Sequence, residues 1–161
     1  MRRFFCLALG LCLLLAGCRV DTGTETAVFY YVQTDYQTAM STPIGGEYKE
    51  ISGHSGDLSY LLHLYLMGPS QSTLASPLPR GCQLLSVEQN AYGLQIRLSD
   101  VGDTMTDAAF SLACACLTLT FQELAQVQTV TVTSGSRKVT MDRESVTLFD
   151  SGATAATEES A

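Results

Sequence analysis

Residues 83–99 read QLLSVEQNAYGLQIRLS, and this stretch decides the fold class. Every second residue from Leu94 to Leu98 is apolar, and the residues between them are polar. Alternation with a period of two predicts a strand with one buried face and one wet face. The preceding half alternates around Leu85 and Val87, and residues 90–93 (NAYG) have the composition of a hairpin turn. We therefore predict an antiparallel β-hairpin within the domain.

A short helix is predicted before this hairpin, over Asp57–Met67. Asp57 can accept backbone N–H bonds at the start of the helix, and Gly68 followed by Pro69 ends it. The apolar residues of this helix form two stripes. The first has the spacing of a core-facing stripe and comprises Leu58, Leu61, Leu62, Tyr65 and Leu66. The second lies on another face and comprises Tyr60, Leu64 and Met67.

Two explanations account for the second stripe. The favoured one is that residues 70–80 fold back over it and bury it within the domain. The other is that a partner protein covers it, because a helix that is apolar nearly all round is usually buried on more than one side. The exposure of Tyr60, Leu64 and Met67 in the folded chain decides between these explanations.

A second, longer helix is predicted over Thr104–Leu124. Asp103 is its candidate N-cap, and Asp107 suits the positive end of the helix dipole. Further strands are predicted at 27–32, 127–133 and 138–141, with a short edge strand at 47–51 and a final extended piece at 145–149. The order β-α-β-β-α-β predicts an α+β fold in which two helices pack on one face of a mainly antiparallel sheet of three to five strands.

The first seventeen residues have the features of an export signal. Met1–Arg3 is basic, and Phe4–Leu15 is an apolar run too short for a membrane-spanning helix, which needs about 20 residues. Residues 15–18 read LAGC and resemble the lipobox of bacterial lipoproteins in all four positions. The resemblance implies cleavage before Cys18, acylation of its sulfur with fatty acids such as palmitate, and a lipid anchor on the outer face of the cytoplasmic membrane.

These boundaries divide the chain of 161 residues into four parts. We expect a signal peptide at 1–17, a lipidated Cys and tether at 18–26, one domain at 27–149 and a disordered acidic tail at 150–161. The composition, 46% hydrophobic and 16% charged, excludes a wholly disordered chain. The net charge of −7 becomes −9 once the two arginines of the signal peptide are removed, which argues against binding to nucleic acid.

Three cysteines remain in the predicted domain, namely Cys82, Cys114 and Cys116. An odd number excludes a complete disulfide framework. Cys114 and Cys116 lie two residues apart on the predicted helix, about 200° around its axis, so they cannot both point at one metal ion. Free buried thiols are favoured, and a bridge from Cys82 to one of the other two stays open.

No motif supports catalysis, a cofactor or a metal site. Residues 53–56 (GHSG) are one residue short of the Gly-x-Ser-x-Gly nucleophile elbow, and the histidine directly precedes the serine, which is poor geometry for a general base. Asp100, Asp103 and Asp107 could offer oxygen ligands to Ca²⁺, but they lack the spacing of an EF-hand. Helix capping is the favoured role for these aspartates, and we predict that the protein is not an enzyme.

Three stretches together resemble the GerMN domain, a module of sporulation and spore-germination lipoproteins. The first is residues 61–69, a helix that ends in LMGP. The second is residues 76–99, where SPLPRG precedes the two hairpin strands. The third is residues 112–132, where LACACLTLT is followed by Leu124, Val127, Val130 and Val132. Order and spacing match the family over Leu61 to Val132.

The resemblance implies a fold similar to ring-building motifs and a non-enzymatic role in protein–protein assembly in the cell envelope. The expected partners are the lipid bilayer, through acylated Cys18, and an envelope protein or further copies of the chain. The alternative is a lipoprotein that binds a small ligand or a cell-wall fragment. That alternative requires a deep pocket lined by a few convergent polar groups.

Overall fold

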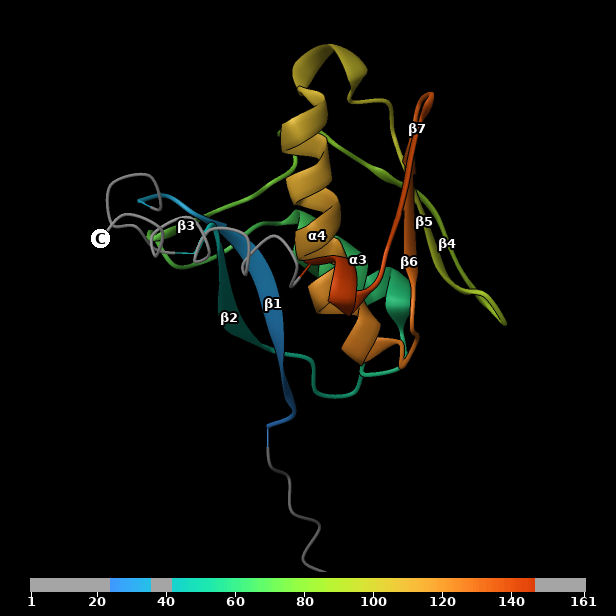
Figure 1. Cartoon of the computed structure of the whole chain (residues 1–161). Coiled ribbons are helices and arrows are strands. Elements are labelled where there is room, and N and C mark those ends of the chain that lie inside the picture. The colour runs from blue at the N-terminus through green and yellow to red at the C-terminus, as the bar shows by residue number, and fades with distance from the viewer. Residues whose placement is uncertain (1–23, 36–41, 147–161) are drawn as a thin grey trace, which may run out of the picture.

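A computed structural model describes residues 24–35 and 42–146, which form two sheets with two helices between them (Figure 1). The first sheet has the strand order β2-β1-β3, where β1 is Thr26–Gln33, β2 is Ile44–Glu50 and β3 is Leu74–Ala75. The second has the order β4-β5-β6-β7, where β4 is Leu84–Asn90, β5 is Gly93–Leu98, β6 is Val130–Ser134 and β7 is Arg137–Met141. The helices are α3 (Leu58–Leu66) and α4 (Asp107–Leu124), and a 3₁₀ turn, η1 (Gly102–Thr104), precedes α4.

The predicted α+β class and the mainly antiparallel pairing are confirmed, because β5 and β6 are the only neighbours that pair in parallel among the strands that the structure describes. The strands form two sheets, however, and not one. The reason is visible at β1, where the backbone N–H of Tyr30 donates to Thr120 Oγ1 of α4 at 2.9 Å. The helix therefore accepts the hydrogen bond of a β1 N–H group that would otherwise pair with a further strand. Since α4 packs against β1 on one side and against β6 and β7 on the other, it separates the two sheets.

Helix α3 forms where the sequence predicted it. Asp57 Oδ1 accepts the backbone N–H of Tyr60 at 3.0 Å, which is the expected N-cap bond. At the other end Gly68 takes a left-handed backbone conformation (φ 85°) that glycine adopts without steric cost. The buried residues of α3 are Leu61, Leu62 and Tyr65, all from the predicted core-facing stripe.

The start of α4 differs from the prediction. The helix begins at Asp107, and its cap is Thr106, whose Oγ1 accepts the N–H of Ala109 at 3.2 Å. The prediction of Asp103 as the cap was wrong, because Asp103 lies within η1 and the extended backbone of Met105 (φ −135°, ψ 138°) interrupts the helical path. Asp107 does occupy the first turn, as predicted, and its carboxylate pairs with Arg137 Nε at 3.2 Å.

Several strand boundaries also shift. Strand β1 begins at Thr26, one residue inside the predicted tether, and β2 begins at Ile44, three residues before the predicted edge strand. Strand β6 starts only at Val130, because Gln126 in a left-handed conformation (φ 52°) turns the chain after α4. Residues 143–146 are helical and not extended, while 147–149 lie outside the described residues, as do the predicted signal peptide, Cys18 and the predicted acidic tail.

A β-bulge changes which residues of β4 face the core. Leu84 pairs with Leu98, and Ser86 pairs with Arg97, so Leu85 is an extra residue on its strand. An extra residue reverses the alternation of the side chains beyond it. As a result Leu84 packs against the core and Leu85 is 57% exposed, contrary to the prediction that Leu85 shares a buried face with Val87.

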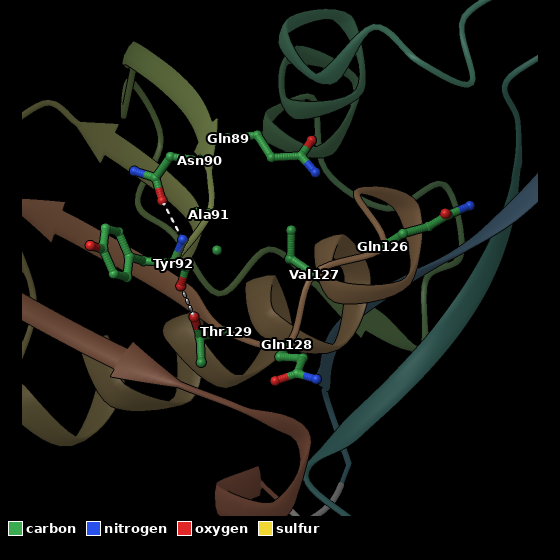
Figure 2. Close-up of a pocket in the computed structure, with 9 residues that line it drawn as sticks. Gln89, Asn90, Ala91, Tyr92, Gln126, Val127, Gln128 and Thr129 are labelled. Atoms are coloured by element: carbon green, nitrogen blue, oxygen red, sulfur yellow. Dashed lines mark hydrogen bonds between the residues drawn. The ribbon is translucent and has the colours of Figure 1, made fainter.

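The tip of the β4–β5 hairpin is tied to the loop before β6 (Figure 2). Thr129 Oγ1 donates to the Tyr92 carbonyl at 2.5 Å, and the N–H of Leu94 donates to the Thr129 carbonyl at 3.0 Å. Gly93 (φ 127°) permits this approach, because a Cβ at this position would lie 2.3 Å from the Thr129 carbonyl oxygen. Only glycine fits where two backbones come so close.

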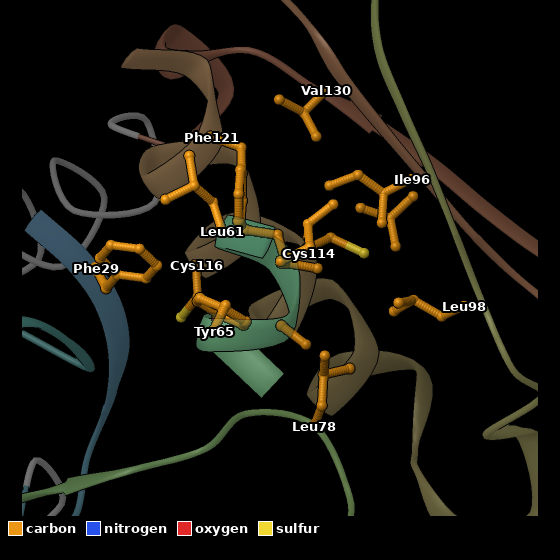
Figure 3. Packing of buried hydrophobic residues seen from close by; sticks show 14 of the residues in the cluster. Phe29, Leu61, Tyr65, Leu78, Ile96, Leu98, Cys114, Cys116, Phe121 and Val130 are labelled. Carbon is orange, nitrogen blue, oxygen red and sulfur yellow. The ribbon is translucent and has the colours of Figure 1, made fainter. Parts of the chain in front are cut away.

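Both sheets and both helices contribute to one hydrophobic core (Figure 3). Around Tyr65 of α3 the rings of Phe29, Tyr31 and Phe121 lie at centroid distances of 6.4, 4.9 and 5.9 Å. The second sheet supplies the other side of the core with Leu94, Ile96, Leu98, Val130 and Val132, all 0 or 1% exposed. Aromatic side chains from β1, α3 and α4 thus lock the first sheet to both helices.

The three cysteines in the described residues are free thiols. Cys114 and Cys116 are buried in α4, as predicted, and Figure 3 shows Cys116 beside Tyr65 while Cys114 lies on the side of Ile96. Burial raises the pKa of both thiols to about 12, so they stay protonated and unreactive at neutral pH. Both behave as small apolar side chains of the core.

Candidate functional site

The face of α3 that points away from the core carries the most exposed apolar side chains of the helix. Tyr60 is 39% exposed and Met67, at the C-cap, is 81% exposed. Leu64 is only partly buried but packs against the core. The predicted second stripe therefore divides. The expectation that it is covered within the domain was wrong for Tyr60 and Met67, because these two residues lie on the side of the helix opposite its buried residues. Leu64 lies nearer to the buried side and therefore reaches the core.

We call Tyr60, His63 and Met67 the α3 strip, since they follow one another at helical spacing on its exposed side. His54, from the preceding loop, stacks on the ring of Tyr60 at a centroid distance of 3.8 Å with an interplanar angle of 15°. His63 Nδ1 donates to the Ser59 carbonyl at 2.7 Å. Both histidines of the sequence thus lie on this surface, and His54 holds the Tyr60 ring by stacking.

This stacking also bears on the GHSG motif at 53–56. His54 is engaged with an aromatic ring, and Ser55 is an exposed loop residue. A serine nucleophile needs a histidine that accepts its proton and an acid that orients the histidine. Among the residues that the structure describes, no hydrogen bond of Ser55 to a histidine is seen. The motif serves here to form a loop that packs onto α3.

A buried charged network fixes the end of α3 to the first sheet. Glu47 of β2 is 2% exposed, and its carboxylate accepts the backbone N–H of Ser70 (2.9 Å), the Ser70 hydroxyl (3.0 Å) and the N–H of Gln71 (3.0 Å). Lys49 Nζ lies 3.4 Å from Glu47 Oε1 and donates to the Gly68 carbonyl at 2.7 Å. Met67 and the residues after it are therefore held in one place relative to β2.

Several opposing effects determine the pKa of the Glu47 carboxyl. Desolvation by burial raises the pKa, but the N–H of Gln71, the hydroxyl and N–H of Ser70 and the charge of Lys49 together lower it more strongly. The net result is a pKa below the usual value for glutamate. This network was not predicted from the sequence. The spacing of two between Glu47 and Lys49 in a predicted strand was the available signal, since it places both on one face.

An open pocket of about 280 Å³ lies between the hairpin tip and the α4–β6 loop (Figure 2). Its lining is uncharged and comprises residues 89–93 and 126–129. Gln89 Nε2 donates to the Ala125 carbonyl at 2.9 Å and so joins the hairpin to the end of α4, whereas Asn90 Oδ1 accepts the N–H of Tyr92 at 2.8 Å within the hairpin turn. The Tyr92 ring points away from Val127 (Figure 2) and is 87% exposed. The pocket is open, whereas the ligand-binding alternative requires a deep one.

The aspartates near α4 have separate structural roles. Asp100 Oδ1 accepts the N–H of Gly102 at 2.8 Å, and Asp107 pairs with Arg137. Within 24–35 and 42–146, no group of three or more His, Cys, Asp or Glu side chains is placed to hold a metal ion. None of the helices in the same residues is long and apolar enough to cross a membrane.

Comparisons with known proteins agree with the resemblance seen in the sequence. Residues 28–140 match the Germane family, which is described as "Sporulation and spore germination". Curated proteins give no match. A solved structure described as "Crystal Structure of Putative Lipoprotein from Clostridium perfringens" is similar at 19% identity and a TM-score of 0.46, over 74% of this chain and 88% of that chain. The family match covers well over half of the sequence and extends beyond the stretch 61–132 on both sides. The chain therefore belongs to the Germane family of sporulation and spore germination.

Proposed function

We propose that this chain is an exported, lipid-anchored protein that assembles with another envelope protein in sporulation or germination, and that it catalyses no reaction. The observation that carries this proposal is the α3 strip in a chain of the Germane family. Its exposed Tyr and Met, with the stacked His54, have the composition of a protein interface, in which aromatic residues and methionine are enriched.

The outer face of the second sheet offers a contrast. On β5, β6 and β7 the side chains that alternate with the core residues are polar and comprise Gln95, Arg97, Thr131, Thr133, Lys138 and Thr140. Thr131 and Thr140 share a hydrogen bond of 2.8 Å across the strands. A face of this kind is well solvated and needs no partner. The α3 strip, with apolar side chains in water beside a rigid network, is the better candidate for a partner.

Partner capture tests the proposed role of the strip. We expect the double variant Tyr60→Ser, Met67→Ser to lose the envelope protein that crosslinks to the wild-type chain in sporulating cells, because hot spots centre on a few aromatic and apolar anchors. The readout is mass spectrometry of crosslinked material. Tyr92→Ser is the matched control, since Tyr92 is more exposed and lies on the hairpin tip. Equal capture by the double variant, or no envelope protein with the wild type, would contradict the proposal.

The lipid anchor is tested at Cys18. We expect Cys18→Ser either to release the protein from membranes or to leave the precursor uncleaved, since a diacylated cysteine supplies the two chains that stable anchoring needs. Membrane fractionation and the mass of the N-terminal peptide measure both outcomes. Cys82→Ser, which changes a cysteine within the domain, should fractionate like the wild type. Unchanged fractionation of Cys18→Ser with a normally cleaved N-terminus would exclude the anchor.

A further inference from the structure

Among the residues that the structure describes, one edge of the first sheet is open along β2. The strand order places β2 at this edge, with β1 on its other side. The N–H of Ile51 donates to the Glu25 carbonyl, and the N–H of Gln33 donates to the Pro43 carbonyl, so the odd-numbered residues of the pair exchange the bonds between the two strands. The backbone groups of Gly46, Tyr48 and Glu50 therefore point toward the free edge.

The exposure of these residues shows that the edge is accessible. Tyr48 is 76% exposed, and Gly46 and Glu50 are also exposed. Since Gly46 has no side chain, its exposure is that of its backbone. An open edge is a template for pairing with another strand, and proteins commonly block it with a bulge, proline or an outward lysine. The bulge at Leu85 does this on β4, whereas Lys49 of β2 points inward to Glu47 and the Gly68 carbonyl.

The residues of β2 are complementary to a second copy of the same strand. We propose that two copies of the chain pair in antiparallel orientation along β2, with Tyr48 of each copy at the two-fold axis. In this register Glu47 lies opposite Lys49 of the second copy and Lys49 lies opposite Glu47, so the buried Glu47–Lys49 pair of each copy has unlike charges as its neighbours across the interface. The two Tyr48 rings pair on the outer face, and Glu50 meets Gly46, which has no side chain to oppose it.

A register centred on an odd-numbered residue satisfies these conditions less well. A register centred on Glu47 brings two carboxylates directly opposite each other, and like charges in that position are destabilising. The register centred on Tyr48 keeps the two carboxylates apart. It also pairs the even-numbered residues of β2 with each other, and these are the residues whose backbone N–H and C=O groups point toward the free edge. The network of Glu47 with Ser70 and Gln71 holds the strand rigid before pairing, which lowers the entropy lost on association.

Dimerisation along β2 is independent of the α3 strip, because it uses a different surface and the chain as its own partner. Anchoring both copies in one membrane raises their effective concentration. The closed interface is isologous, so it ends at two copies and leaves the α3 strip of each copy free for another protein.

Disulfide trapping tests this dimer in the full-length chain in membranes. Cα atoms of a hydrogen-bonded antiparallel pair lie about 5.5 Å apart, which is within the range that a disulfide spans. We expect Tyr48→Cys, in a Cys82→Ser background, to shift from monomer to a disulfide-linked dimer under mild oxidation. Tyr92→Cys in the same background, at a more exposed position, reports random collision and should stay monomeric. Linking of Tyr48→Cys no greater than that of Tyr92→Cys would overturn the proposal.

A second pair of variants tests the axis without a new cysteine. Tyr48→Glu places two carboxylates at the axis and should abolish the dimer seen by native mass spectrometry of detergent-extracted chain, whereas Tyr48→Phe should retain it. Both substitutions fall on an exposed side chain, so the fold is preserved and circular dichroism checks this. A persistent dimer in Tyr48→Glu would exclude the β2 interface. Partner capture through Tyr60 and Met67 is a separate measurement, so its outcome does not depend on this one.

Discussion

Phe121→Ala is expected to destabilise the domain by about 4 kcal/mol, the cost of removing a large buried aromatic side chain and leaving a cavity. Phe121 is 0% exposed. Its ring lies edge-on to Phe29 of β1 at 6.4 Å and to Tyr65 of α3 at 5.9 Å, so it joins three elements from distant parts of the chain. Urea unfolding followed by circular dichroism measures the change in the free energy of unfolding.

The control for this prediction is Leu85→Ala, which removes an apolar side chain of similar chemistry. Leu85 is the bulge residue of β4 and is 57% exposed, so its loss should change the free energy of unfolding by only about 0.5 kcal/mol. A loss in Phe121→Ala no larger than that of Leu85→Ala would contradict the single core shared by both sheets and both helices.

Glu47→Ala is expected to cost about 3 kcal/mol, because removing one partner of a buried ion pair leaves the other charge and several donors without an acceptor. Lys49 would remain near the Tyr31 ring, 5.5 Å from its centroid, with the Gly68 carbonyl as its remaining partner in the network. The N–H groups of Ser70 and Gln71 would lose the carboxylate that they share. Chemical denaturation at neutral pH provides the measurement.

The same carboxylate makes stability depend on pH. The pKa of Glu47 is lowered in the folded chain, so the carboxylate contributes stability that is fully present above its unfolded pKa of about 4.3. This contribution is lost as the pH falls through the lower, folded pKa. Glu47→Gln carries no charge at any pH and should therefore show a smaller decrease in stability between neutral and acid pH. Glu50→Gln, on an exposed residue of the same strand, is the matched control and should retain the wild-type slope.

Features that depend on neighbours in the chain could be predicted from the sequence. The Asp57 cap, the glycine stop at Gly68 and the core stripe of α3 follow from contacts within a few residues, and each was confirmed. The hairpin of β4 and β5 followed from alternation and turn residues in the same way. The family resemblance rests on such local stretches in a constant order, which is why it was visible without a structure.

Features that depend on distant residues were predicted less well. Nothing near Leu85 indicates a bulge, because the bulge appears only in the register with which β4 pairs with β5. The choice of Thr106 over Asp103 as the cap of α4 depends on the path that η1 imposes on the chain. The exposure of Tyr60 and Met67 could not be deduced from their spacing, since spacing shows which residues share a face and not what covers that face.

The sequence by itself determined the α+β class, the two helices, the hairpin and the membership of the Germane family. Only the tertiary structure decided that α4 divides the strands into two sheets and that Glu47 and Lys49 join β2 to the end of α3. It also decided that no other strand in the described part of the chain pairs with the outer edge of β2. The physical reason is the range of the interactions. Caps, turns and periodicity act over a few residues, whereas the bond from Tyr30 to Thr120 and that from Ser70 to Glu47 join groups that only folding brings together.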